Sequence, residues 1–238
     1  MSAATLIPPP EPVVSPPEVR EVSEARTIYM GARPLTFEEF LALFGEDDDV
    51  ELIDGVAVKR MAAQLDHERL FAWLIRLLGD FAEERNLGTV LGSRTAVRIT
   101  GFRGRLPDLL FVRREREGIL QQSALSEAPD LVIEIVSPGD RPSDLITLEA
   151  DYRSVGVPQI VFVDLGQQTI RVLRRSGSGG GAGEYADEIL HAGDGLTLDA
   201  LDRMRVPVEA LLADNRPPVR QVLARVSGDS GDEPQSTV

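Results

Sequence analysis

Apolar residues recur at helical spacing in three segments of the chain. The longest segment is predicted to begin at Asp66, whose carboxylate can cap a helix, and to continue through Glu84. Its apolar stripe consists of Leu70, Trp73, Leu74, Leu77, Leu78 and Phe81. Two shorter helices are predicted at residues 36–44, which open with a capping box, and at residues 143–155, where Ser143 is the expected cap. Stripes of this kind indicate packing against a core.

One hairpin is predicted with its register. Residues 50–60 contain two short apolar runs on either side of Asp54-Gly55, the dipeptide preferred in a two-residue type I′ turn. In the register set by this turn, Lys59 points away from Glu51, whereas Arg60 shares the face of Glu51.

Further apolar runs predict the remaining β-strands. They lie near residues 89–91, 95–99, 106–112, 131–136, 159–164, 169–174 and 185–190. The glycine-rich residues 176–183 lie between two of these strands and have no P-loop lysine, so a flexible hairpin loop is expected there. Helices and strands together predict a mixed α/β fold.

Proline content separates two tails from the folded unit. Residues 1–33 are rich in proline and lack apolar periodicity, which predicts a disordered arm. Residues 34–213 are predicted to form the domain, and residues 214–238 a disordered tail. A short helical pattern at residues 219–226 interrupts this tail, but nothing in the sequence attaches it to the domain.

Composition limits the classes of function. The 238 residues are 42% hydrophobic, which supports a substantial core, and they include no cysteine, which excludes disulfides and thiolate chemistry. No run approaches about eighteen apolar residues, so a cytoplasmic protein without membrane partners is expected. Because the formal net charge is -14, any contact with nucleic acid has to be local.

Carboxylates within apolar runs mark the candidate chemistry. Asp108 and Glu134 each interrupt a predicted buried strand, where an ionised carboxylate is costly unless it is paired or bound to a cation. A shared hard divalent ion such as Mg²⁺ accounts for both residues. Glu51, which begins the hairpin, is a candidate third ligand. Alternatively, Glu51 is an exposed strand residue and Asp108 a solvated turn residue.

An ordered set of short motifs resembles a known family. The set comprises Glu51-Leu52-Ile53-Asp54-Gly55, His67, Pro107-Asp108, Glu134-Ile135-Val136-Ser137-Pro138, Asp144, Tyr152, Gly156-Val157-Pro158 and Val163-Asp164. In order and spacing it is similar to the restriction endonuclease family of the Uma type, within the PD-(D/E)XK nuclease superfamily, over about residues 34–212.

The resemblance implies a fold and a function. The implied fold is a restriction-endonuclease-like core, a central mixed β-sheet flanked by helices, with an added β-hairpin region. The implied activity is hydrolysis of DNA with Mg²⁺ or Mn²⁺ bound by Glu51, Asp108 and Glu134, with His67 near the site. A homodimer is implied by analogy with other nucleases that cut two strands.

The sequence departs from the family in its catalytic lysine. The superfamily lysine position holds Val136, and the alternative position on the following helix holds Leu148 within an apolar stripe. Arg60 and Arg141 are candidate replacement cations, although neither can act as a general base. Ordinary surface charge is the alternative for both.

Arginine is also concentrated around the Asp108 strand. This group, which includes a further candidate DNA contact in Arg105, consists of Arg94, Arg98, Arg103, Arg105, Arg113, Arg114 and Arg116. It would guide a phosphate backbone, or else it forms solvated strand edges.

Three functions therefore remain open. The first is a metal-dependent endonuclease with weakened catalysis. The second is a degenerate nuclease fold that binds nucleic acid or protein. The third is a carboxylate-metal hydrolase acting on another substrate.

Overall fold

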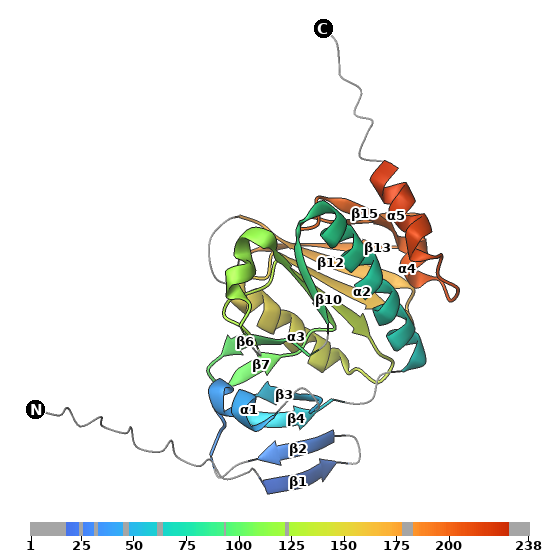
Figure 1. Cartoon of the computed structure of the whole chain (residues 1–238). Coiled ribbons are helices and arrows are strands. Elements are labelled where there is room, and N and C mark those ends of the chain that lie inside the picture. Colours follow the sequence, from blue (N-terminus) through green and yellow to red (C-terminus); the bar gives the residue numbers. More distant parts are fainter. Residues whose placement is uncertain are drawn as a thin grey trace, which may run out of the picture.

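A computed structural model of the chain describes residues 18–23, 26–30, 33–44, 48–60, 64–92, 94–121, 124–177 and 183–228. Its elements form two large sheets with helices packed against them (Figure 1). The mixed α/β prediction is confirmed. The expected central mixed sheet flanked by helices is the six-stranded one, and the strands of the predicted hairpin lie in the second large sheet.

The six-stranded sheet has the order β13-β12-β11-β10-β8-β5. Its strands are β5 (Gly88–Gly92), β8 (Leu109–Arg113), β10 (Leu131–Val136), β11 (Gln159–Asp164), β12 (Thr169–Arg175) and β13 (Tyr185–Leu190). The sheet is mixed, because β10 and β11 run parallel while the other neighbours run antiparallel.

The seven-stranded sheet has the order β1-β2-β4-β3-β7-β6-β9. Its strands are β1 (Glu18–Ser23), β2 (Arg26–Met30), β3 (Val50–Ile53), β4 (Val56–Lys59), β6 (Ala96–Thr100), β7 (Arg103–Arg105) and β9 (Ala124–Leu125). A third, two-stranded sheet pairs β14 (Gly195–Leu198) with β15 (Met204–Pro207).

Helices cover both faces of the six-stranded sheet. The helical elements are α1 (Phe37–Leu43), α2 (Leu65–Arg85), the 3₁₀ helix η1 (Arg114–Ile119), α3 (Pro142–Val155), α4 (Val208–Leu212) and α5 (Val219–Gly228). The stripe of α2 packs with Ile133 and Ile135, whereas Tyr152 of α3 packs with Val132 and Leu110. Because side chains alternate along a strand, Glu134 therefore faces α3.

The predicted hairpin register is confirmed. Across β3 and β4, Glu51 faces Val58 and Val50 faces Lys59. Asp54 and Gly55 have φ values of 51° and 76°, as a type I′ turn requires. A Cβ on Gly55 would also lie 2.4 Å from the Cβ atom of Pro34, so the turn favours glycine there for a second reason.

Helix starts were predicted with mixed success. The capping box of α1 is present, with reciprocal bonds between Thr36 and Glu39. The predicted caps of the other two helices were wrong, since α2 begins one residue before Asp66 and α3 has Arg141 as its N-cap. Proline at the first position of α3 favours that earlier start, because its φ angle already suits a helix.

The predicted tails also need correction. Residues 18–23 and 26–30 fall within the predicted disordered arm, but they form β1 and β2, which pair with each other, and Ile28 of β2 lies opposite Val58. Backbone pairing with the hairpin extends the sheet regardless of nearby prolines. Residues 1–17 lie outside the described part.

At the other end, α5 packs on α2. Val219, Val222 and Val226 are buried in the same cluster as the α2 stripe. The indole Nε1 of Trp73 also donates to the carbonyl oxygen of Pro217 at 2.8 Å. The prediction of a disordered tail was therefore wrong for residues 219–228, because the partner of this short apolar stripe lies far away in the sequence. Residues 229–238 lie outside the described part.

Candidate active site

The two strand carboxylates meet where the chain passes from one sheet to the other. Asp108 immediately precedes β8, and the adjacent Leu109 pairs with Ile133 of β10. The backbone N–H of Ile135 donates to Asp108 Oδ2 at 2.8 Å, and the backbone N–H of Asp108 lies 3.4 Å from Glu134 Oε2. Both residues are buried, with exposed fractions of 2% for Asp108 and 6% for Glu134.

Burial and proximity separate the pKa values of this carboxylate pair. Burial, followed by the charge of Asp108, raises the pKa of Glu134 well above its ordinary value. Burial also acts to raise the pKa of Asp108, but hydrogen bonding to His67 and the charge of Arg60 outweigh it and lower that pKa. The raised pKa shows that nearby positive charge does not offset the burial of Glu134 and its repulsion by Asp108. Buried groups with strongly shifted pKa values are candidates for functional sites.

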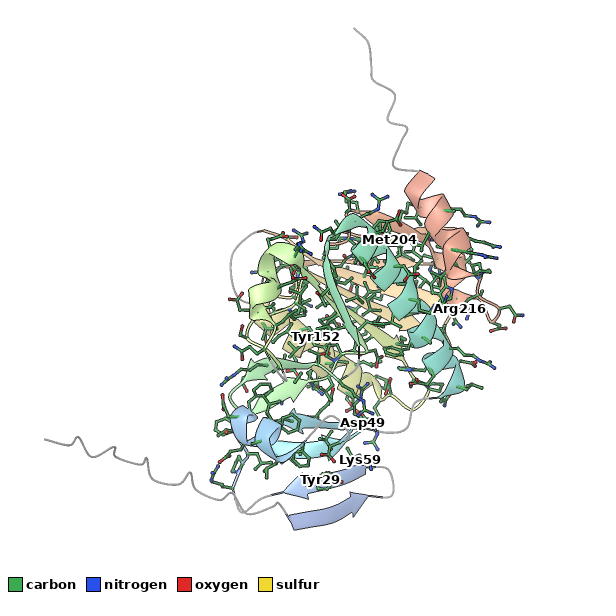
Figure 2. All side chains as sticks on the ribbon, in the orientation of Figure 1. Tyr29, Asp49, Lys59, Tyr152, Met204 and Arg216 are labelled. Carbon is green, nitrogen blue, oxygen red and sulfur yellow. The ribbon has the colours of Figure 1, made fainter. Side chains whose placement is uncertain are left out.

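Helix α3 supplies the partner of Glu134. The hydroxyl of Tyr152 donates to Glu134 Oε1 at 2.5 Å. Burial and then the charge of Glu134 raise the pKa of Tyr152 well above its ordinary value, so the phenol stays a proton donor. Figure 2 shows Tyr152 in the interior of the molecule, away from Lys59 on the hairpin. Tyr152 belongs to the set of family motifs in the sequence, but the sequence alone does not indicate its function.

Two basic side chains contact Asp108. Arg60 follows β4, and its NH2 group donates to Asp108 Oδ1 at 3.0 Å while NH1 donates to the carbonyl oxygen of Leu106 at 2.9 Å. His67 lies in the first turn of α2, and its Nε2 atom is 3.0 Å from Asp108 Oδ2. The prediction that His67 lies near the carboxylates agrees with this placement.

Neighbouring carboxylates raise the pKa of both groups. Burial alone would lower the pKa of Arg60, but the charges of Glu51, Asp108 and Glu134 raise it. Burial would also lower the pKa of His67, and hydrogen bonding to Asp108 raises it above its ordinary value. Lys59 is exposed and faces Val50, which confirms that it points away from Glu51.

Glu51 lies in a separate network of ion pairs. Arg105 NH1 donates to its Oε2 atom at 2.9 Å, and the Leu106 N–H donates to Oε1 at 3.1 Å. Arg105 Nε in turn donates to Asp151 at 2.7 Å, and Arg103 joins Asp151 to Asp54. We call Asp54, Arg103, Asp151, Arg105 and Glu51 the arginine–carboxylate network.

Sequence reasoning missed Asp151. The signal that would have found it is its position, three residues after Leu148 and four before Val155, on the flank of the apolar stripe of α3. The network also buries Arg105, whose side chain is 7% exposed. Arg105 is thus held inside the protein, so we do not include it among the proposed DNA contacts.

The other candidate cations lie elsewhere. Arg141 is exposed at the start of α3, and Leu148 is half-buried against the apolar cluster beneath that helix. Several arginines around the Asp108 strand are already paired: Arg98 with Glu38, and Arg116 with Asp130. This pairing reduces the positive charge that the group can offer to a phosphate backbone.

The carboxylate pair fits a hard divalent ion better than the full predicted ligand set does. Within the described residues, no group of three or more histidine, aspartate or glutamate side chains is arranged to hold an ion. Magnesium is commonly held by one or two carboxylates together with water and substrate phosphate. Asp108 and Glu134 supply two such carboxylates close together, although their oxygens also have hydrogen-bond partners. Glu51 differs in that its partner Arg105 is shared with Asp151 in the arginine–carboxylate network.

Comparison with known proteins identifies the family. The Uma2 family model, described as "Putative restriction endonuclease", matches residues 37–209, which is more than half of the chain. The chain belongs to the Uma2 family. This result confirms the resemblance drawn from the motifs. The match covers every residue of the carboxylate pair, the arginine–carboxylate network and their basic partners.

A solved structure shares the fold of this Uma2 protein. It is a putative nuclease belonging to DUF820 from Anabaena variabilis, with a TM-score of 0.61 and 17% sequence identity. The alignment covers 75% of this chain and 98% of that one. No curated protein matches the sequence. No helix in the described part is both long and apolar enough to cross a membrane.

Proposed function

We propose that this Uma2 protein is an endonuclease that hydrolyses phosphodiester bonds of DNA, with Mg²⁺ or Mn²⁺ held by Asp108 and Glu134. The observation that carries the proposal is the buried pair itself, in which Glu134 has a pKa raised by burial and by Asp108. A cation between the two carboxylates would offset both the burial of Glu134 and its repulsion by Asp108. The family description and the nuclease fold of the structural neighbour support the same class of reaction.

Protein groups hold the two proposed ligands in place. His67 and the Ile135 N–H fix one oxygen of Asp108, and Tyr152 fixes one oxygen of Glu134. A bound divalent ion would supply an activated water and neutralise charge on the phosphate. Glu51 would serve as a third ligand only after one of its oxygens left Arg105 or the Leu106 N–H, and in the present arrangement it acts on Glu134 through its charge.

Arginine would replace the missing lysine only as a source of charge. The guanidinium of Arg60 contacts Asp108, so its charge would act on a phosphate bound beside the pair. Arg141, exposed at the start of α3, is proposed as a second phosphate contact. Neither loses its proton, so both would act electrostatically. We further propose a cytoplasmic homodimer, in which each subunit cuts one strand.

A catalytically degenerate nuclease fold is the second candidate. Two observations favour it: Leu148 packs against apolar side chains, and Arg60 already provides Asp108 with a cation. In this case the protein would bind nucleic acid or another protein without cleaving it.

Cleavage assays separate the two candidates. Purified protein is incubated with plasmid and with single-stranded DNA, with Mg²⁺ or Mn²⁺ and with chelator. Glu134→Gln is the test variant, and Glu188→Gln, an exposed carboxylate on β13, is the matched control. We expect metal-dependent nicking that falls by at least about 100-fold in Glu134→Gln and is unchanged in Glu188→Gln. Metal binding without cleavage by any of the proteins would instead favour the degenerate fold.

A further inference from the structure

We infer that Arg60 is a built-in cation that competes with the divalent ion for Asp108, so that metal binding requires the arginine to release Oδ1 of that carboxylate. This inference rests on the proposed function, because it concerns the same ion.

The two oxygens of Asp108 are held differently. Oδ2 accepts the backbone N–H of Ile135 at 2.8 Å and lies 3.0 Å from Nε2 of His67. Oδ1 is contacted by NH2 of Arg60 at 3.0 Å. Oδ2 is therefore engaged by the backbone of β10 and by α2, whereas Oδ1 is engaged by one long side chain. Oδ1 is the oxygen that can change its partner without any movement of the sheet.

Arg60 is more exposed than the carboxylate that it contacts. Its side chain is 26% exposed, while that of Asp108 is 3% exposed. The guanidinium is anchored from its other side, because NH1 donates to the carbonyl oxygen of Leu106 at 2.9 Å. An ion that binds Asp108 therefore has to do so beside a positive group that is already in contact with that carboxylate.

The charges around Arg60 are those that would attract a metal ion. Glu51, Asp108 and Glu134 all act on the guanidinium. A divalent ion beside Asp108 would compete for the same negative field and be repelled by the positive charge of Arg60. If Arg60 served instead to preorganise Asp108 for the ion, removing it would weaken binding. The two roles thus predict opposite changes in metal affinity.

Measuring metal affinity without DNA shows directly whether removal of Arg60 strengthens or weakens metal binding. Mn²⁺ is titrated into metal-free, full-length protein by calorimetry, for the wild type, Arg60→Met and Arg60→Lys. Arg171→Met, which removes a half-buried arginine on β12 that also contacts two carboxylates, is the matched control, and Asp108→Asn tests that binding occurs at this site. We expect Arg60→Met to bind Mn²⁺ at least about tenfold more tightly than the wild type. Arg60→Lys keeps the charge and should stay nearer the wild type, and Arg171→Met should leave affinity unchanged.

The outcomes separate this inference from the proposed function. Weaker or equal binding by Arg60→Met, beside a wild type that binds Mn²⁺, overturns the competition and leaves the metal-dependent nuclease intact. Absence of Mn²⁺ binding in the wild type and in all Arg60 variants overturns both the metal requirement and the competition. Should Arg60→Met fail to fold, Arg60→Gln is neutral and retains a donor for Leu106, and the same tightening is expected of it.

Discussion

Two adjacent residues of α3, Asp151 and Tyr152, contact two different groups of charges. The negative charge is matched by arginine in one group and is not matched in the other. In the arginine–carboxylate network, Asp151 accepts hydrogen bonds from both Arg103 and Arg105. One residue further along, Tyr152 is the donor to Glu134, whose pKa is raised by burial and by its neighbour Asp108. Adjacent residues of one helix therefore serve a compensated group and an undercompensated group.

The difference separates structure from function. A buried ion pair that is fully hydrogen-bonded holds elements together, and breaking it destabilises the fold. A carboxylate that remains short of positive charge costs stability and is retained where it binds something. On this basis the arginine–carboxylate network is mainly structural, and the carboxylate pair is the candidate site.

The largest effect on stability is expected in the network. Asp151→Asn removes the shared partner of Arg103 and Arg105, although each arginine keeps a second carboxylate. We expect a loss of about 3 kcal/mol in the free energy of unfolding, measured by urea denaturation. Asp187→Asn, which breaks an exposed pair with Arg171, should cost less than about 1 kcal/mol. Equal losses in the two variants would contradict the structural role of the network.

Removing the donor to Glu134 should have a smaller effect. Tyr152→Phe leaves a buried carboxylate without its hydroxyl partner, and we expect a loss of about 1 to 3 kcal/mol by the same measurement. Tyr185→Phe is the matched control, because its hydroxyl donates to the neutral carbonyl of Val157 at 2.7 Å. A larger loss from Tyr185→Phe would contradict a special contribution of the hydrogen bond between Tyr152 and Glu134 to stability.

Neutralising Glu134 should increase the free energy of unfolding, whereas the substitutions at Asp151 and Tyr152 should decrease it. Glu134→Gln keeps an acceptor for Tyr152 but removes the charge that burial and Asp108 oppose. We expect a gain of about 1 kcal/mol in unfolding free energy in the presence of chelator, together with loss of Mn²⁺ binding. A clear loss of stability without metal would place Glu134 with Asp151 among the structural charges.

The smallest effect concerns a half-buried carboxylate in the first turn of α1. A hydrogen bond from Arg33, followed by the backbone N–H of Thr36, lowers the pKa of Glu39 to about 2. Because this pKa is depressed, its contribution to stability is present above the ordinary value of 4.5 and is lost as pH falls toward about 2.

Arg33→Ala should raise the pKa of Glu39 toward 4.5, as followed by NMR titration of the side-chain carboxyl carbon. Thermal unfolding at neutral pH should change little, because the side chain of Arg33 is exposed. An unchanged pKa in the variant would mean that the capping hydrogen bond from Thr36, and not Arg33, lowers it.

Local sequence patterns, in which the residues lie only a few positions apart, predicted many of the structural elements of this protein. The hairpin register follows from Asp54-Gly55, the start of α1 from its capping box, and the core face of α2 from its apolar stripe. Asp108 and Glu134 could be selected because a carboxylate inside an apolar strand is conspicuous in any sequence. Each of these features depends on backbone geometry or on local burial.

Contacts between distant segments were decided by the tertiary structure. Arg60 meets Asp108 48 positions later, Arg105 meets Asp151 46 positions later, and α5 finds its apolar partner in α2. The sequence offered Arg60 and Arg141 as equivalent cations, and the fold placed only the first of them against a carboxylate of the pair. An ion pair depends on where two surfaces meet, and that position is set by the packing of whole sheets and helices. The sequence by itself therefore determined the elements and the residues able to perform the chemistry, whereas the tertiary structure decided which charges neutralise one another.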